Sequence, residues 1–195
     1  MKAERTRQHI VEKTAPLFNT KGFAGTSLTD MEKATGLTKG SLYGNFVDKD
    51  EIASAAFKYS MDKVREMIRG QLEGAVTKKK QLIALFEFFA TYVFNPPIEG
   101  GCPLLNMAIE ADDYRTSMRR VVVRELMSTI HFISSLLEEG VAEGEFKKDI
   151  NPRALAYSFF CAIEGAVIFS RVERSAEPIK IIMKHCKDTL NQISK

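Results

Sequence analysis

A cluster of cationic, hydroxyl and amide side chains lies between residues 38 and 49 of this 195-residue chain. A lysine can reach a phosphate or a base edge of DNA, and a tyrosine hydroxyl can donate to a phosphate oxygen. With 100° of rotation per residue, Leu42 and Phe46 define the inward face of a short helix, and Gly40 and Gly44 point away from it. Ser41, Tyr43 and Asn45 flank these glycines and Thr38 lies close to the inward face, so the candidate contacts to nucleic acid are Lys39, Tyr43 and, beyond the helix, Lys49.

Two glycines in one short helix need an explanation, because each costs about 1 kcal/mol relative to alanine. Close approach of the helix backbone to another surface would explain Gly40 and Gly44, and simple tolerance is the alternative. Lys49 begins the next helix, where free backbone N–H groups already favour an anion; a solvated charge is its alternative role. Thr26 and Ser27 begin the preceding helix and are candidates for another phosphate contact, with capping as the alternative for Ser27.

Three short helices are predicted to hold this cluster. The first spans about residues 4–21, Gly36 turns the chain after the second, and the third runs from a Thr38 cap to about Phe46. Helices this short need tertiary packing, which we expect from Ile10, Thr14, Leu17, Phe18, Leu28, Met31, Ala34 and Leu37. A glycine-containing turn between the last two helices is helix-turn-helix geometry, in which the third helix enters the major groove.

The remaining sequence predicts about six further, mostly longer helices, which makes the fold all-α with about nine helices. The predicted domains are a helix-turn-helix DNA-binding domain over residues 1–47 and a ligand-binding and dimerisation domain over residues 48–195. Asp48 and Glu51 have the spacing of a capping box at the first of these helices. The further helices are expected over residues 48–69, 78–94, from 103 onward, 114–142, 152–172 and 178–193.

Composition places the chain among ordinary globular proteins, with 45% hydrophobic residues and a net charge of +3. The charged first residues are not typical of a signal peptide. The sequence also shows no apolar run of about 18 residues, so we expect no membrane span. We therefore expect a cytoplasmic protein that binds no membrane. The cysteines and histidines are too scattered for a disulfide framework or a metal site, so we expect no enzyme, cofactor or metal. We expect the acidic residues Glu110, Asp112 and Asp113 to cap the long helix that follows and to be solvated.

Residues 5–52 resemble the N-terminal segment of the TetR (tetracycline repressor-like) family of bacterial regulators. The resemblance rests on Thr26-Ser27, on Gly36-Leu37-Thr38-Lys39-Gly40-Ser41-Leu42-Tyr43 and on Phe46-x-Asp48-Lys49. It implies a homodimer that binds double-stranded operator DNA of palindromic sequence and responds to a small-molecule effector. The DNA-binding residues that it implies are Thr26, Ser27, Thr38, Lys39, Gly40, Ser41, Tyr43, Gly44, Asn45 and Lys49. The family commonly has Tyr-Tyr-His-Phe where this chain has Tyr43-Gly44-Asn45-Phe46, so Tyr43 is the firmest implied contact.

Aromatic and methionine residues of the larger region are candidates to line a cavity for an apolar or aromatic effector, and a filled core is the alternative. The candidates are Phe86, Phe89, Tyr92, Val93, Cys102, Leu105, Met107, Met127, His131, Phe132 and Phe160. Cys102 precedes Pro103 at a helix start, where the helix dipole lowers a thiol pKa. It is either an oxidant or electrophile sensor, as in some regulators of the family that it resembles, or an inert thiol.

The last two helices are predicted to pair with a second copy, because in the TetR family they form a four-helix bundle with their symmetry mates. The candidate interface residues are Leu155, Phe159, Ala162, Ile163, Ala166, Ile182, Met183, Cys186 and Leu190. The function that follows is a DNA-binding transcriptional repressor that a small molecule releases from its operator. A transcriptional activator of the same fold, and a helical small-molecule-binding protein without a DNA role, are the alternatives.

Overall fold

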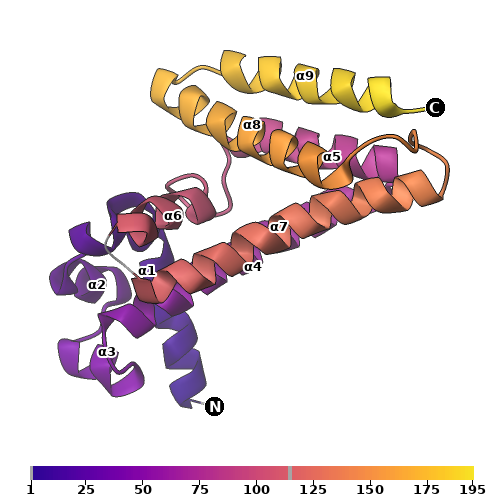
Figure 1. The fold of residues 1–195 in the computed structure, drawn as a ribbon. Coiled ribbons are helices and arrows are strands. Elements are labelled where there is room, and N and C mark those ends of the chain that lie inside the picture. Colours follow the sequence, from indigo (N-terminus) through magenta and orange to yellow (C-terminus); the bar gives the residue numbers. More distant parts are fainter. Residues whose placement is uncertain (1, 114–115) are drawn as a thin grey trace. The chain divides into compact units, whose positions relative to one another are not determined.

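The computed structural model describes residues 2–113 and 116–195, and over these ranges it contains nine helices and no named strand (Figure 1). The predicted all-α fold is therefore confirmed. The helices are α1 (Lys2–Gly25), α2 (Leu28–Thr35), α3 (Lys39–Asn45), α4 (Lys49–Leu72), α5 (Lys78–Tyr92), α6 (Pro103–Asp113), α7 (Thr116–Ala142), α8 (Pro152–Glu173) and α9 (Glu177–Ile193). Tyr114, the predicted start of the seventh helix, lies outside the described residues.

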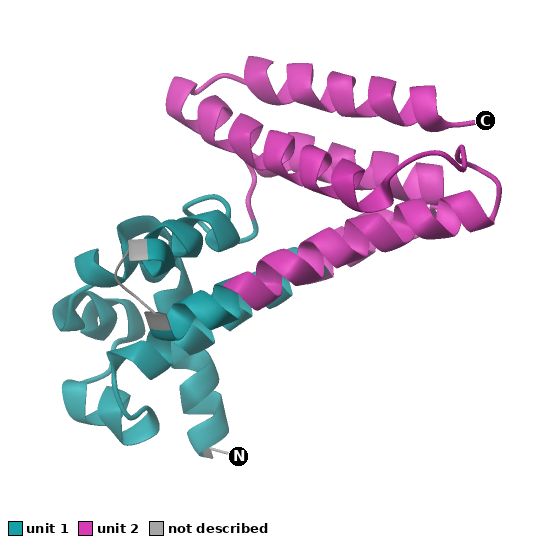
Figure 2. Ribbon diagram, viewed as in Figure 1, with its two compact units in different colours: residues 1–65, 97–122 teal, residues 66–96, 123–195 magenta. Residues whose placement is uncertain are grey.

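The chain divides into two compact units (Figure 2). Unit 1 comprises residues 1–65 and 97–122, and unit 2 comprises residues 66–96 and 123–195. Unit 1 thus contains the whole predicted helix-turn-helix domain, together with α6 and the first parts of α4 and α7. The predicted boundary after Val47 divides the chain by expected role, and it stays a prediction.

The core of unit 1 lies among α1, α2, α3 and the start of α4. Ile10, Met31, Leu42 and Ile52 supply one fully buried side chain from each of these helices. The first helix breaks at Gly22, as the sequence predicts. The backbone of this residue has a φ of +71°, which residues other than glycine rarely adopt. Short helices that are individually unstable are therefore held by a shared core.

Caps define where the short helices of unit 1 begin. The Ser27 hydroxyl accepts from Asp30 N at 3.1 Å, and the Asp30 carboxylate accepts from Ser27 N at 2.8 Å, which completes a capping box. The box predicted for Asp48 and Glu51 is only half formed: Glu51 N donates to Asp48 Oδ1 at 2.8 Å. The Glu51 carboxylate accepts instead from Val47 N, one residue earlier than the box requires.

Unit 2 is built around α5, α8 and α9, and α9 packs on both of the others. The Phe86 and Phe159 rings meet edge to face, with centroids 5.1 Å apart, and so join α5 to α8. The Glu145 carboxylate accepts from the backbone N–H groups of Lys78 and Lys79 at 3.0 and 2.9 Å, and thereby caps α5. These contacts join α5 to α8 and fix where α5 begins.

One helix contradicts the expectation that no segment is apolar enough to span a bilayer. By length and composition alone, α8 could cross a membrane. This carries little weight, because a core helix of a bundle passes the same test. One face of α8 is buried and packs on α9.

Candidate nucleic-acid interface

The outer face of α3 is open, as the periodicity predicts. Lys39, Gly40 and Gly44 are exposed, whereas Leu42 is fully buried and Phe46 nearly so. A Cβ atom added at Gly44 would meet no atom within 4 Å, so nothing inside the chain requires glycine there. Because Gly40 and Gly44 have no side chains, the backbone of α3 is accessible along its exposed side.

The start of α3 is fixed by two acceptors. The Thr38 hydroxyl accepts from Ser41 N at 3.4 Å, as predicted for a cap, and a carboxylate oxygen of Glu32 accepts from Lys39 N at 2.6 Å. At the other end, the Asn45 amide donates to Ser41 O at 2.8 Å. The side chains of Thr38 and Asn45 are thus hydrogen-bonded to backbone groups of α3 in the free protein, whereas Lys39 is exposed.

Tyr43 and Lys49 have structural contacts that the sequence did not predict. The half-buried Tyr43 ring packs against the core of unit 1. The Lys49 ammonium donates to Phe23 O at 2.5 Å and lies 4.2 Å from the centroid of the Phe23 ring. It is therefore tied to the turn between α1 and α2, and its role as a phosphate contact stays a prediction.

Thr26 is a correction to the predicted DNA-binding set. Its side chain is fully buried, and its hydroxyl donates to Gly22 O at 2.7 Å and lies 3.3 Å from Leu17 O. A hydroxyl enclosed in this turn cannot present itself to a phosphate, so Thr26 holds the α1–α2 turn. Ser27 is exposed but serves as the N-cap of α2. Lys21 and Ser27 hydrogen-bond the Asp30 carboxylate and hold its pKa well below the usual value.

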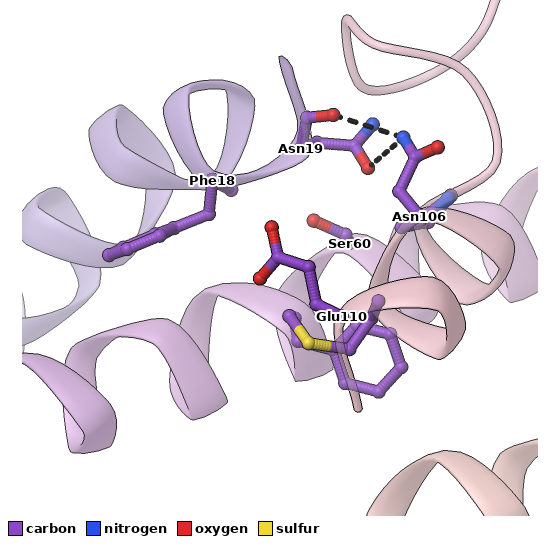
Figure 3. Close-up of a pocket in the computed structure, with 9 residues that line it drawn as sticks. Phe18, Asn19, Ser60, Asn106 and Glu110 are labelled. Carbon is purple, nitrogen blue, oxygen red and sulfur yellow. Dashed lines mark hydrogen bonds between the residues drawn. The ribbon is translucent and has the colours of Figure 1, made fainter. Parts of the chain in front are cut away.

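A polar contact between α1 and α6 was missed in the sequence (Figure 3). The Asn106 amide nitrogen donates to both the backbone oxygen and Oδ1 of Asn19, each at 3.0 Å. The Asn19 amide in turn donates to the carbonyls of Glu99 and Gly101. Glu110, expected to be solvated, instead accepts from Phe23 N through both carboxylate oxygens. No local periodicity signals contacts that span more than 80 residues.

A shallow cavity of about 20 Å³ lies beside this polar contact, between α1, α4 and α6 of unit 1. Its lining includes Phe18, Ser60, Met107 and Glu110. The volume suits a single water molecule and is far too small for an organic effector. Of the predicted pocket residues, only Met107 lines it.

The other predicted pocket residues are distributed over both units. Phe86, Phe89, Tyr92, Val93 and Phe160 are buried in unit 2. Three others, Met127, His131 and Phe132, are exposed on α7. Cys102 and Leu105 are half-buried in unit 1, and Cys102 O accepts from Asn106 N at the start of α6. The effector pocket and the sensor role of Cys102 stay predictions.

Most of the predicted dimer residues belong to the core of a single chain. Six of them are already buried within the single chain: Phe159, Ile163, Ala166, Met183, Cys186 and Leu190. Burial also raises the pKa of the Cys186 thiol to about 11. They are used up in packing of α8 and α9 on each other and on α5, so they cannot form the surface of an interface. Leu155, Ala162 and Ile182 are half-buried.

A different set of apolar residues is exposed on the last two helices. Phe169 is 62% exposed and Val172 79% exposed on α8, and Ile181 is 59% exposed on α9. Ile168 and Cys161 are also exposed on α8. The sequence pattern identified α8 and α9 as apolar helices, but most of the residues that it assigned to the interface face the core of unit 2.

Two segments match descriptions of one protein family. Residues 10–56 match the bacterial regulatory proteins of the tetR family, and residues 78–186 match the tetracyclin repressor-like C-terminal domain. The two matches together extend through both compact units.

Solved structures of two regulators resemble the whole chain. A TetR-family transcriptional regulator from Cytophaga hutchinsonii is 35% identical, with a TM-score of 0.94, over 100% of this chain and 97% of that one. A TetR transcriptional regulator from Chloroflexus aurantiacus J-10-FL is 36% identical, with a TM-score of 0.95, over 99% and 98%.

Two curated relatives that match most of the chain are less similar in sequence than these two structures. The HTH-type transcriptional repressor DhaR of Mycobacterium sp. (strain GP1) is 25% identical over 89% of this chain and 86% of its own length. The HTH-type transcriptional repressor NemR of Escherichia coli (strain K12) is 22% identical over 95% and 94%. The helix-turn-helix of unit 1 and these matches agree, and the chain belongs to the TetR family of DNA-binding transcriptional regulators, which is not a family of enzymes.

Proposed function

We propose that this protein is a repressor that binds a palindromic operator as a homodimer and is released by a small-molecule effector. The observation that carries the DNA-binding part is the open face of α3, where exposed Lys39 stands beside the exposed Gly40 and where a Cβ at Gly44 would meet no atom within 4 Å. A helix surface with no Cβ at positions 40 and 44 lets backbone approach the floor or wall of the major groove. Such a regulator acts in the cytoplasm, where its operator lies.

The exposed apolar surface of α8 and α9 supports the homodimer. Large apolar side chains at Phe169, Val172 and Ile181 are costly to leave in water, and Phe169 and Val172 are neighbours one turn apart on α8. A second copy is the occupant that we propose, because a palindromic operator requires two symmetric recognition helices about 34 Å apart. This surface replaces the buried residues that the sequence suggested.

The contacts between α6 and α1 support a route for the effector signal. Asn106 and Glu110 of α6 hold Asn19 and the backbone of Phe23, next to the capping box that begins α2. An effector can release DNA only if it binds more tightly to a conformation with misplaced recognition helices. We propose that an apolar or aromatic effector favours a conformation in which these contacts of α6 are altered.

Selection of bound sequences from random duplex DNA tests the operator proposal. We expect enrichment of one palindromic sequence, and an affinity that falls by about 0.9 log units per log unit of salt for each phosphate contacted. Lys39→Ala is expected to weaken binding to the selected site and relax its base preference. Lys184→Ala, which removes an exposed lysine of α9, is the control. Absent or non-palindromic enrichment would contradict the proposal.

A further inference from the structure

Arg7, in the second turn of α1, contacts the far end of the recognition helix. Its Nη1 donates to Asn45 O, the last residue of α3, and its Nη2 donates to Glu51 Oε1 at 2.8 Å. The guanidinium carbon also lies 4.0 Å from the centroid of the Phe46 ring. One side chain therefore joins α1, the end of α3 and the first turn of α4.

Glu51 closes this arrangement from the other side. While one carboxylate oxygen takes the Arg7 bond, the second accepts from Val47 N at 2.7 Å. The Arg7 guanidinium, followed by the Val47 N–H, lowers the pKa of Glu51 below its usual value, so the carboxylate stays ionised at neutral pH. We call Arg7 and Glu51 together the α3 clamp. It binds the chain immediately before and immediately after Phe46.

The end of α3 needs such a partner. The last carbonyls of a helix have no intrahelical donor and carry a partial negative charge, which a cation at that end stabilises. The other anchors of the seven-residue α3 are the acceptors Thr38 and Glu32 at its start and the side chains of Leu42, Tyr43 and Phe46 on its inner side. These anchors fix the start and one side of the helix, whereas its last carbonyl, at Asn45, is held by Arg7. A planar guanidinium that bonds a carbonyl and a carboxylate at once restricts movement of this end of the helix, whereas a lysine ammonium is a point charge without the same fixed geometry.

We propose that Arg7 and Glu51 are positioning residues for operator recognition, which hold α3 in the orientation that matches base edges. The inference rests on the operator binding proposed above. Base contacts need a defined helix orientation, whereas non-specific binding depends mainly on phosphate charge. Loss of the clamp therefore reduces the ratio of specific to non-specific affinity, although every side chain on the outer face of α3 is still present.

The test compares Arg7→Met, Glu51→Gln and the double variant with the wild-type full chain, on the selected operator and on a scrambled duplex. Each single variant is expected to lower the specific-to-non-specific ratio about tenfold, and the double variant is expected to be no worse than either single one. Glu51→Gln is informative because it adds no negative charge and so cannot weaken DNA binding by repulsion. Arg7→Lys is expected to restore part of the ratio.

Arg65→Met is the matched control, because Arg65 is also 42% exposed and pairs with a carboxylate, Asp62, in the same unit. All variants are measured below their thermal transitions, so that a merely less stable fold cannot change the ratio. Amide exchange at Phe46, whose N–H donates to Leu42 O, is expected to accelerate in Arg7→Met and not in Arg65→Met.

The outcomes separate the two proposals. If the wild-type protein enriches no duplex, the operator-binding proposal is wrong, and so is the proposed role of the α3 clamp in operator recognition. A wild-type protein that binds selectively, together with Arg7 and Glu51 variants of unchanged ratio, would overturn the clamp alone.

Discussion

The backbone N–H of Phe23 points at the Glu110 carboxylate and donates to both of its oxygens, at 2.9 and 3.0 Å, across 87 residues of chain. The carbonyl of the same residue accepts from the Lys49 ammonium. Phe23 is thus the point at which α6 and the start of α4 both hold the turn that leads into the helix-turn-helix. Glu110 of α6 and Lys49 of α4 therefore hold the two backbone polar groups of the same residue.

Glu110→Ala is expected to destabilise the protein by about 1–3 kcal/mol, because the Phe23 N–H loses a charged acceptor. Urea denaturation measures this change in the free energy of unfolding. Asp112→Ala removes an exposed acid two residues away on α6 and serves as the control, with an expected effect within about 0.5 kcal/mol. Equal effects of the two substitutions would mean that the contact contributes nothing specific.

Gly22→Ala is expected to be destabilising for two separable reasons. Its φ of +71° and ψ of 175° are strained for any other residue, at about 1–3 kcal/mol, and the new Cβ would overlap Glu110 Oε1. In a Glu110→Ala background the overlap is gone and the strain remains. The cost of Gly22→Ala should therefore be about 1 kcal/mol smaller in that background, as a double-mutant cycle measures. Strict additivity would show that the two residues do not meet.

Local sequence signals predicted much of unit 1. Capping residues, glycine turns and apolar spacing predicted Thr38 as the cap of α3 and placed the start of α2 at Thr26 or Ser27, of which Ser27 is the cap. These features depend on neighbours within about four residues, which periodicity and capping rules describe well. The same rules gave the buried positions of Leu42 and Phe46.

Contacts between distant segments were beyond such rules. Glu110 looks like a solvated acid in its own helix, and only the fold brings it to Phe23. On α8, periodicity shows that two sides are apolar, but not which side α9 covers. Ile163 was therefore assigned to the exposed face of α8, whereas it is buried and Phe169 is exposed.

The stability of unit 1 is expected to depend on pH through Asp30. Because its pKa is lowered in the folded protein, the ionised form stabilises the fold above the unfolded pKa of about 4, and this stabilisation is lost as pH falls further. Asp30→Asn should thus lower the Tm at pH 7, and the difference from wild type should narrow between pH 4 and pH 2. Helical circular dichroism during thermal unfolding measures both. If the difference in Tm between wild type and Asp30→Asn is the same from pH 4 to pH 2, the pKa of Asp30 is not lowered in the folded protein.

Phe169→Asp is expected to shift the protein from dimer to monomer without unfolding it, because the exposed ring lies on the proposed interface and not in the core. Sedimentation at micromolar concentration gives the mass, and the circular dichroism spectrum reports the fold. Val76→Asp, at a residue 83% exposed between α4 and α5, is the control and should leave the mass unchanged. A Phe169→Asp variant that is still dimeric would place the interface elsewhere.

Gly44→Ala separates helix stability from DNA approach. Alanine favours a helix by about 0.5–1 kcal/mol over glycine, and the added Cβ meets no atom of the chain within 4 Å. The variant should therefore be as stable as wild type or more so. If the backbone of α3 contacts the major groove at this point, the methyl group must push the helix away, and operator affinity should fall about tenfold or more.

The matched control for Gly44 is Gly70→Ala in α4, where glycine is also exposed and an added Cβ also meets nothing within 4 Å. It should bring the same gain in the free energy of unfolding and no change in operator affinity. Thermal unfolding and fluorescence anisotropy of labelled operator DNA measure the two quantities on the same samples. A Gly44→Ala variant that binds the operator as tightly as wild type would show that this glycine is merely tolerated, and that α3 presents side chains, rather than backbone, to the DNA.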